Sequence, residues 1–191
     1  MRLLLLFLIT VLNAANLSAQ LADINDPGTF SFSINHSRLS DEVAISSVNH
    51  RERSYALNLN YTISRRFSVL GRHTIIRSNT IDRPGELSTY RISGGAVRFN
   101  ALNSGTGQFY LQLGGAIGDY CTCGEDYTSR RSGLGYVNYG LGAHIRAIGP
   151  VYVNASFEGN PIVNRLGPSV DKYAYNVLQI GVTVLLLDLN D

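Results

Sequence analysis

The sequence is poor in several residue types that most soluble domains use freely. Its 191 residues include no tryptophan, one methionine and two cysteines, and Lys172 is the only lysine. Charged residues make up 16% of the chain, against about 25% in an ordinary soluble domain. The net charge of +2 is too small for a chain that binds nucleic acid through its phosphates, so we exclude that class.

Long apolar runs are also absent, apart from one at the start. The opening MRLLLLFLITVLNAANLSAQ has the basic residue, short apolar stretch and small-residue junction of a secretory signal peptide. We therefore expect residues 1–19 to be cleaved on export and residues 20–191 to form one domain. Beyond this signal, nothing approaches the roughly 20 apolar residues that a transmembrane helix needs. Only a closed β-barrel could place such a chain in a membrane.

What the sequence does contain is strict alternation with a period of two. Between Tyr55 and Ile63, apolar side chains occupy every second position, and alanine or polar side chains such as Asn58 and Asn60 fill the others. This is the period of a β-strand. In a soluble protein the apolar face would point into a core, whereas in a transmembrane barrel it would point to lipid.

Eight segments of the chain share this strand-like pattern. Most are longer than the usual strand of about five or six residues, and they suit the about 9–11 residues with which a tilted strand crosses a bilayer. Polar connections separate them. The segments are Thr29–Ser37, Arg53–Ile63, Phe67–Arg77, Ser88–Phe99, Gln108–Gly118, Leu134–Ala147, Val151–Glu158 and Tyr173–Leu185.

Short and long connections alternate along the chain without exception. The short ones are Ser64–Arg66, Asn100–Gly107 and Ile148–Pro150, and the long ones are Arg38–Glu52, Ser78–Leu87, Asp119–Gly133 and Gly159–Lys172. Outer-membrane barrels alternate in this way, with short periplasmic turns and long extracellular loops. With an even number of strands, both ends of the domain then lie on the periplasmic side.

Aromatic residues gather near the ends of the predicted strands, where the interfacial girdles of membrane barrels lie. Side chains on the other face of each strand are small or polar, as the narrow interior of an eight-stranded barrel requires. The aromatic residues in question are Phe30, Tyr55, Phe67, Tyr90, Phe99, Tyr136, Phe157 and Tyr173.

Together, the signal peptide, the eight long alternating strands and the alternating connections resemble the small eight-stranded bacterial outer-membrane β-barrels, such as the transmembrane domain of outer membrane protein A and its short single-domain relatives. The resemblance implies an all-β protein, an eight-stranded antiparallel up-and-down transmembrane β-barrel, in the outer membrane of a Gram-negative cell. It further implies a monomer without a cofactor. The ending Leu189-Asn190-Asp191 departs from the terminal aromatic residue that is common in these proteins.

Under this topology, four arginines and one acid of the strands point into the lumen: Arg72, Arg91, Arg98, Arg146 and Glu158. One interpretation is a positive interior that admits anions. The other is a plug of arginines hydrogen-bonded to tyrosines, amides and the glutamate, and the narrow interior favours it. We expect Arg77 or Arg91 to be able to reach Glu158, and Arg146 to lie too near the inner end.

Two strands do not fit the alternation. Tyr90 and Ile92 share one parity while Val97 and Phe99 share the other, which predicts a bulge at Gly94-Gly95. In the preceding strand Arg72 is followed by His73, so one of the two must face lipid. Arginine is the costlier residue there, so we turn Arg72 inward and leave His73 on the lipid side without an explanation.

The predicted loops carry charges of both signs. The basic residues are Arg38, Arg51, Arg53, Arg83, Arg130, Arg131 and Arg165, and the acids are Asp41, Glu42, Glu52, Asp82, Glu86, Glu125, Asp126 and Asp171. Arginine binds phosphate with two parallel hydrogen bonds, so these residues are candidate partners for lipopolysaccharide phosphates. Because acids match the bases, ordinary solvated charge is the simpler interpretation.

The two cysteines, Cys121 and Cys123, fall in the third long loop with one residue between them. Outside the cytoplasm thiols tend to oxidise, but a bridge closing so short a ring would be strained. A loop disulfide or an intermolecular contact is the favoured interpretation. A redox or metal role is the alternative, although two thiols are few for a metal site.

The predicted function is that of a small outer-membrane barrel with a plugged polar lumen, which acts through its extracellular loops by surface contact, adhesion or stabilisation of the outer leaflet. Its partners would be outer-membrane lipid and an unidentified extracellular molecule. One alternative is a secreted lipocalin-like binder of a small apolar ligand, with the apolar face inward. Another is a lipid A-modifying hydrolase using His36 and Ser37, but adjacent strand residues face opposite sides. We therefore expect no enzyme.

Overall fold

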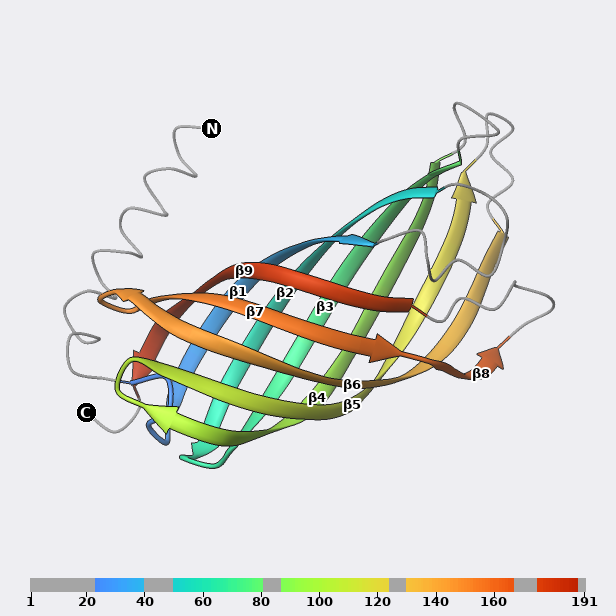
Figure 1. Ribbon diagram of the computed structural model, residues 1–191. Coiled ribbons are helices and arrows are strands. Elements are labelled where there is room, and N and C mark those ends of the chain that lie inside the picture. Colours follow the sequence, from blue (N-terminus) through green and yellow to red (C-terminus); the bar gives the residue numbers. More distant parts are fainter. Residues whose placement is uncertain (1–22, 40–49, 81–86, 124–129, 167–174, 189–191) are drawn as a thin grey trace.

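The computed structural model describes residues 23–39, 50–80, 87–123, 130–166 and 175–188. Nearly all of them lie in tilted antiparallel strands that curl into one closed barrel (Figure 1). Within these ranges, no helix has the length and apolarity to span a membrane.

Nine strand segments build the barrel. They are β1 (Thr29–Leu39), β2 (His50–Ser64), β3 (Phe67–Thr80), β4 (Leu87–Ser104), β5 (Gly107–Cys123), β6 (Arg130–Ile148), β7 (Val151–Asn160), β8 (Ile162–Leu166) and β9 (Tyr175–Asp188). Strands β1 to β6 each pair with the next in sequence, β8 pairs with β6, and β9 pairs with both β7 and β1, which closes the ring.

Strands β7 and β8 together form one strand of the ring. Both pair with β6, one after the other, and Pro161 separates them. Proline has no N–H to donate to the ladder, but its carbonyl accepts from Val137 N at 3.1 Å. The barrel is therefore eight-stranded, antiparallel and up-and-down, as predicted.

The two ends of the barrel differ. Three tight turns gather at one end, which we call the inner end, together with the start of β1 and the finish of β9 (Figure 1). Gly149 has a φ of 52° in one of these turns, a conformation open to glycine. The connection after Phe99 is tighter than predicted, since β4 continues to Ser104 and only two residues precede β5.

At the opposite, outer end the strands reach further than the sequence predicted. Most of the arginines assigned to loops have strand backbone: Arg38, Arg51, Arg53, Arg130, Arg131 and Arg165. Arg83 lies outside the described residues. At this end the strands stay paired beyond the segments in which apolar and polar residues alternate.

The facing of the strands settles which side of the alternation meets lipid. Leu59 is 50% exposed on the outer surface, while Asn58 beside it is 2% exposed in the interior. Ile34, Leu113 and Ile180 on other strands are likewise exposed. The apolar faces point outward as predicted for a membrane barrel, and the lipocalin-like alternative is wrong because it needs them inside.

Strand β4 corrects one prediction. Its pairing with β3 runs without a shift from Phe99 to Leu87, so Gly94-Gly95 is no bulge. The alternation carries straight through, which puts Ile92 inside at 4% exposure and leaves Arg91 exposed on the outer surface. The irregularity falls instead between Asn100 and Leu102, in the pairing with β5.

Aromatic side chains pack in pairs on the outer surface near the inner end. Phe30 and Tyr61 have ring centroids 4.6 Å apart, and Phe67 and Phe99 are 5.5 Å apart. Rings at this level suit the membrane interface. Tyr136 does not belong to a girdle as predicted, because it is buried in the interior at 3% exposure.

Candidate functional site

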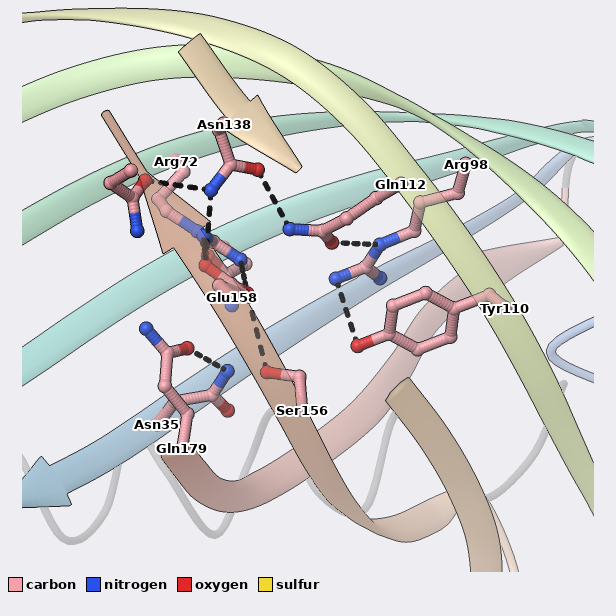
Figure 2. A network of polar contacts seen from close by, with 11 residues as sticks. Asn35, Arg72, Arg98, Tyr110, Gln112, Asn138, Ser156, Glu158 and Gln179 are labelled. Carbon is pink, nitrogen blue, oxygen red and sulfur yellow. Dashed lines mark hydrogen bonds and ion pairs between the residues drawn. The ribbon is translucent and has the colours of Figure 1, made fainter. Parts of the chain in front are cut away.

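The interior of the barrel is filled at three levels, and its middle level is a polar network. At its centre the guanidinium of Arg72 (β3) makes a two-pronged ion pair with the carboxylate of Glu158 (β7), and the Nη2–Oε1 contact measures 2.7 Å (Figure 2). Arg72 Nε also donates to Asn58 Oδ1 at 2.8 Å. Glu158 is 1% exposed, so its charge depends on these donors.

A chain of side-chain hydrogen bonds leads from Glu158 across to the opposite strands (Figure 2). Asn138 Nδ2 donates to Glu158 Oε2 at 3.3 Å, and Gln112 Nε2 donates to Asn138 Oδ1 at 2.8 Å. Arg98 Nε then donates to Gln112 Oε1 at 3.2 Å. The network therefore links β3, β4, β5, β6 and β7 through the middle of the lumen.

This series of hydrogen bonds ends at Arg98, which lies against an aromatic ring. Its Nη2 donates to Tyr110 Oη at 3.3 Å, and its Cζ lies 4.1 Å from the centroid of a tyrosine ring, that of Tyr110. The ring of His144 lies 5.1 Å from that of Tyr110, and its Nδ1 is 2.9 Å from Gln108 Oε1. A cation over an aromatic face is stabilised by the ring quadrupole. The stack fills the cross-section between the network and the inner end.

Polar side chains also pair along the other wall of the lumen. Asn35 Nδ2 donates to Gln179 Oε1 at 3.1 Å between β1 and β9 (Figure 2). Nearer the inner end, Asn154 Nδ2 donates to Thr183 Oγ1 at 2.8 Å, and Ser33 Oγ lies 2.9 Å from the same hydroxyl. Small polar residues thus line the strands that the central network does not reach.

The inner level is apolar and includes residues before β1. Ile24 is 1% exposed and packs in one cluster with Tyr152 and Leu185. Arg146 Nε donates to Tyr152 Oη at 3.0 Å. This level lies at the end of the lumen where the tight turns lie.

The outer level is apolar too. Ile76, Ile92, Tyr136 and Val177 are all buried inward-facing residues towards the outer end. A methyl group placed on Gly118 would lie 3.0 Å from Ile92 Cγ1 and 3.2 Å from Tyr136 Cε2, so both side chains fill the space that this glycine leaves. The polar network is thereby covered from outside.

A small cavity lies beside the central network. Its volume is about 20 Å3, and it is lined by Arg72, Asn138 and Asn160, and by small or apolar residues such as Leu70, Ala96 and Ala116. That volume suits roughly one water molecule. Among the residues that the structure describes, no three histidine, cysteine or acidic side chains gather as metal ligands do.

The structure brings together three of the five residues predicted for the lumen. Arg72, Arg98 and Glu158 share the central network. Arg146 faces inward but lies at the inner level against Tyr152. Arg91 is on the outer surface, and its prediction as a lumen residue is wrong because β4 has no bulge to turn it inward. The partner of Glu158 is accordingly Arg72 and not Arg91.

Sequence reasoning missed the amides that connect the charges. Gln112 and Asn138 look like ordinary inward polar residues in the sequence, and nothing in their spacing indicates that they meet. Residues 23–28 were also missed, because they precede the first alternating segment. A single buried isoleucine shortly after the predicted signal junction carries no pattern of its own.

His73 has a partner that the sequence did not suggest. It lies on the outer surface, and its Nδ1 is 2.8 Å from the Oγ of Ser93 on β4. His36 is also on the outer surface, where Nδ1 is 3.1 Å from the carbonyl of Ser54, while Ser37 is buried inside. His36 and Ser37 therefore do not form the site that the hydrolase alternative needs.

The cysteines lie at the outer end of a strand rather than in a loop. Both Cys121 and Cys123 belong to β5, which ends at the second of them. Their side chains are outside the described part of the structure. A disulfide or an intermolecular contact therefore stays a prediction.

A row of arginines crosses the outer ends of three neighbouring strands. In the register of the sheet Arg38 is paired with Arg53, and Arg53 with Arg77. The side chain of Arg53 is exposed, and so is that of Arg91 on the next strand. Like charges directly opposite one another destabilise a strand pair. We call Arg38, Arg53 and Arg77, which the register sets in line, the arginine row.

Comparison with solved structures places the fold. The chain is similar to neisserial surface protein A, with a TM-score of 0.62 and 14% identity over 82% of this chain and 95% of the other. It is similar to Ail, the attachment invasion locus protein of Yersinia pestis (0.56, 16%, 83% and 99%), which has also been solved with the heparin analogue sucrose octasulfate. A third similar structure is the outer membrane protein OprG from Pseudomonas aeruginosa (0.51, 10%, 85% and 96%).

No protein-family model matches the chain. No curated protein matches it either. At identities this low the solved structures show the fold alone, and that fold is the small eight-stranded outer-membrane β-barrel.

Proposed function

We propose that this chain, which has the fold of the small outer-membrane barrels, is a barrel with a closed lumen whose arginine row holds the phosphates of outer-leaflet lipid. The inner end would then lie in the periplasm and the outer end at the cell surface. The observation that carries the proposal is the register that sets Arg38, Arg53 and Arg77 side by side.

The position of the row supports a lipid headgroup as its ligand. Arg53 lies one outward-facing position beyond Tyr55, whose exposed ring stacks on that of His36 with centroids 4.9 Å apart. Aromatic rings of this kind sit at the level of lipid headgroups. Guanidinium groups at that depth would meet phosphate, which they bind with paired, charge-assisted hydrogen bonds.

The interior supports the same proposal by elimination. Buried side chains occupy three levels of the described interior, and the cavity beside the central network, of about 20 Å3, is far too small for a solute to pass. A barrel of this kind would work at its surface: by stabilising the lipid leaflet, by surface contact or by adhesion. A hydrolytic activity towards lipid remains an alternative that needs residues other than His36 paired with Ser37.

Lipid binding by the row can be tested with Arg53→Gln and with Arg66→Gln as a matched control. Arg66 is an exposed arginine at the inner end, in the turn that joins β2, the strand of Arg53, to β3. Each purified, delipidated variant is titrated with lipid A in detergent and the bound lipid is counted by native mass spectrometry. We expect Arg53→Gln to bind about tenfold more weakly, since a charge-assisted hydrogen bond is worth about 1.5–3 kcal/mol, and Arg66→Gln to bind like the parent.

Two further ligands separate the possible sources of the anion. Dephosphorylated lipid A should bind weakly and equally to both variants if phosphate is recognised. Sucrose octasulfate, the ligand printed for the Ail complex, tests whether a soluble polyanion uses the same arginines. Equal lipid A affinity for Arg53→Gln and the parent would overturn the proposal.

A further inference from the structure

The segment before β1 folds into the inner mouth of the barrel. We propose that residues 23–28 are an internal stopper, which closes the lumen at the periplasmic end independently of the central network. This inference concerns the opposite end of the molecule from the arginine row and does not depend on lipid binding.

Ile24 is the residue that fills the mouth. It is 1% exposed, although it precedes every strand, and it packs against Tyr152 of β7 and Leu185 of β9. Its carbonyl accepts a hydrogen bond from Thr62 Oγ1 of β2 at 2.9 Å. In the ring these strands are neighbours in the order β2, β1, β9, β7. One residue therefore reaches across four consecutive strands.

Hydrogen bonds hold the segment in a fixed shape. Asp26 N donates to Asp23 O, and Asp23 N donates to Asp26 Oδ2, each at 2.9 Å. Gly28, with a φ of 87°, turns the chain into β1 and donates its N–H to Thr62 O at 2.8 Å. A segment bonded to itself and to β2 would keep its place without further contacts.

Tyr152 gives the stopper a polar anchor on the far side. Its hydroxyl accepts from Ile24 N at 3.3 Å and from Arg146 Nε at 3.0 Å. The same hydroxyl donates to Asp23 Oδ1 at 3.5 Å. The stopper thus combines an apolar side chain inside the lumen with polar contacts at its rim.

Thiol accessibility tests the stopper directly. In a Cys121→Ser/Cys123→Ser background, Ser31→Cys reports on the lumen just above Ile24, since Ser31 is the register partner of Leu185. Ser37→Cys reports on the outer half of the same strand. Both serines face the lumen, at 2% and 3% exposure, and neither hydroxyl has a hydrogen-bond partner among the described residues. The two reporters are therefore matched.

The purified mature protein is refolded in detergent and treated with a small, charged methanethiosulfonate. We expect the thiol at position 31 to react slowly in the parent and at least about tenfold faster with Ile24→Asp, which corresponds to about 1.4 kcal/mol. Burial of an aliphatic side chain of this size contributes at least that much. The rate at position 37 should not change, and Ile24→Leu should restore slow reaction at position 31.

Thr62→Val provides a second, milder variant, because it removes the hydroxyl that holds the Ile24 carbonyl while keeping the shape of the side chain. It should accelerate reaction at position 31 in the same direction and by less. Three results would overturn the proposal: fast reaction at position 31 in the parent, no acceleration with Ile24→Asp in a folded barrel, or equal acceleration at both positions, which would mean general loosening.

Discussion

At the scale of single residues, the lumen shows how charge is accommodated in a space without bulk water. Glu158 is almost fully buried and meets Arg72, Asn138 and Ser156, whose Oγ donates to Oε1 at 3.2 Å. Taking a carboxylate and a guanidinium out of water is costly, and the direct ion pair offsets that cost only while both partners are present. Losing either Arg72 or Glu158 alone should therefore be costly, although the pair as a whole adds little net stability.

Removing one partner should show this. Glu158→Gln leaves the Arg72 charge buried without its carboxylate, and we expect the free energy of unfolding in detergent to fall by about 3–5 kcal/mol, measured by urea titration. The double variant Arg72→Met/Glu158→Leu carries no charge at this place. It should be clearly more stable than Glu158→Gln alone. An unchanged midpoint for Glu158→Gln would contradict the role of the pair.

The outer surface has its own example of residues that need each other. His73 and Ser93 face lipid on adjacent strands, and a polar group there costs free energy unless it is hydrogen-bonded. Their contact of 2.8 Å satisfies one hydrogen-bonding group on each. The pair explains how a histidine can occupy a position that its neighbours give to apolar residues.

At the scale of elements, each strand is a two-sided ribbon, and the sides are fixed by the period of two. On β2 the outward residues Tyr55, Leu57 and Leu59 are exposed while Asn58 and Asn60 are buried. A shift by one residue would exchange the two faces completely. Strand β4 keeps its register through Gly94-Gly95, and Arg91 is therefore exposed on the outer surface.

A charge on the outward face of β2 should therefore destabilise the barrel in lipid. Leu59→Arg places a guanidinium on lipid, and we expect a loss of about 2–4 kcal/mol in the free energy of unfolding from a bilayer. Thr106→Arg is a matched control, since Thr106 is exposed in the turn between β4 and β5. Folding into lipid vesicles can be followed by the β-sheet signal in circular dichroism, measured as a function of urea concentration. Equal folding of both variants would contradict the lipid-facing assignment.

At the scale of the whole molecule, the barrel is a closed ring whose outside is apolar and whose inside is filled. Closing a sheet into a ring removes strand edges, and here β9 closes it by pairing with both β1 and β7, while β8 pairs with β6. Among the described residues, buried side chains lie at three levels of the lumen, so the two ends of the barrel carry the features proposed to act. The arginine row lies at one end and the stopper at the other.

Such a molecule should behave as an integral membrane protein. After an alkaline carbonate wash of cell membranes, we expect it to stay in the outer-membrane pellet, because its apolar surface is held by lipid and not by charge. The fraction is detected by immunoblotting. Release into the wash would mean that the protein is only attached to the membrane surface.

The sequence by itself determined the class of the protein and the direction in which its strands face, except in the outer half of β4. Alternation with a period of two needs no knowledge of neighbours, and the placement of Leu59 outside and Asn58 inside followed from it. Strand lengths and the order of short and long connections were equally local. These features predicted an eight-stranded barrel because its repeat is written into every strand.

Only the tertiary structure decided which residues meet. Arg72 and Glu158 are 86 residues apart in sequence, and their contact depends on the stagger of strands around a closed ring, which no single strand encodes. The same closure brings Ile24 onto Tyr152 and sets Arg38 beside Arg53 and Arg77. Facing is a property of one strand, whereas contacts across the lumen are a property of the ring.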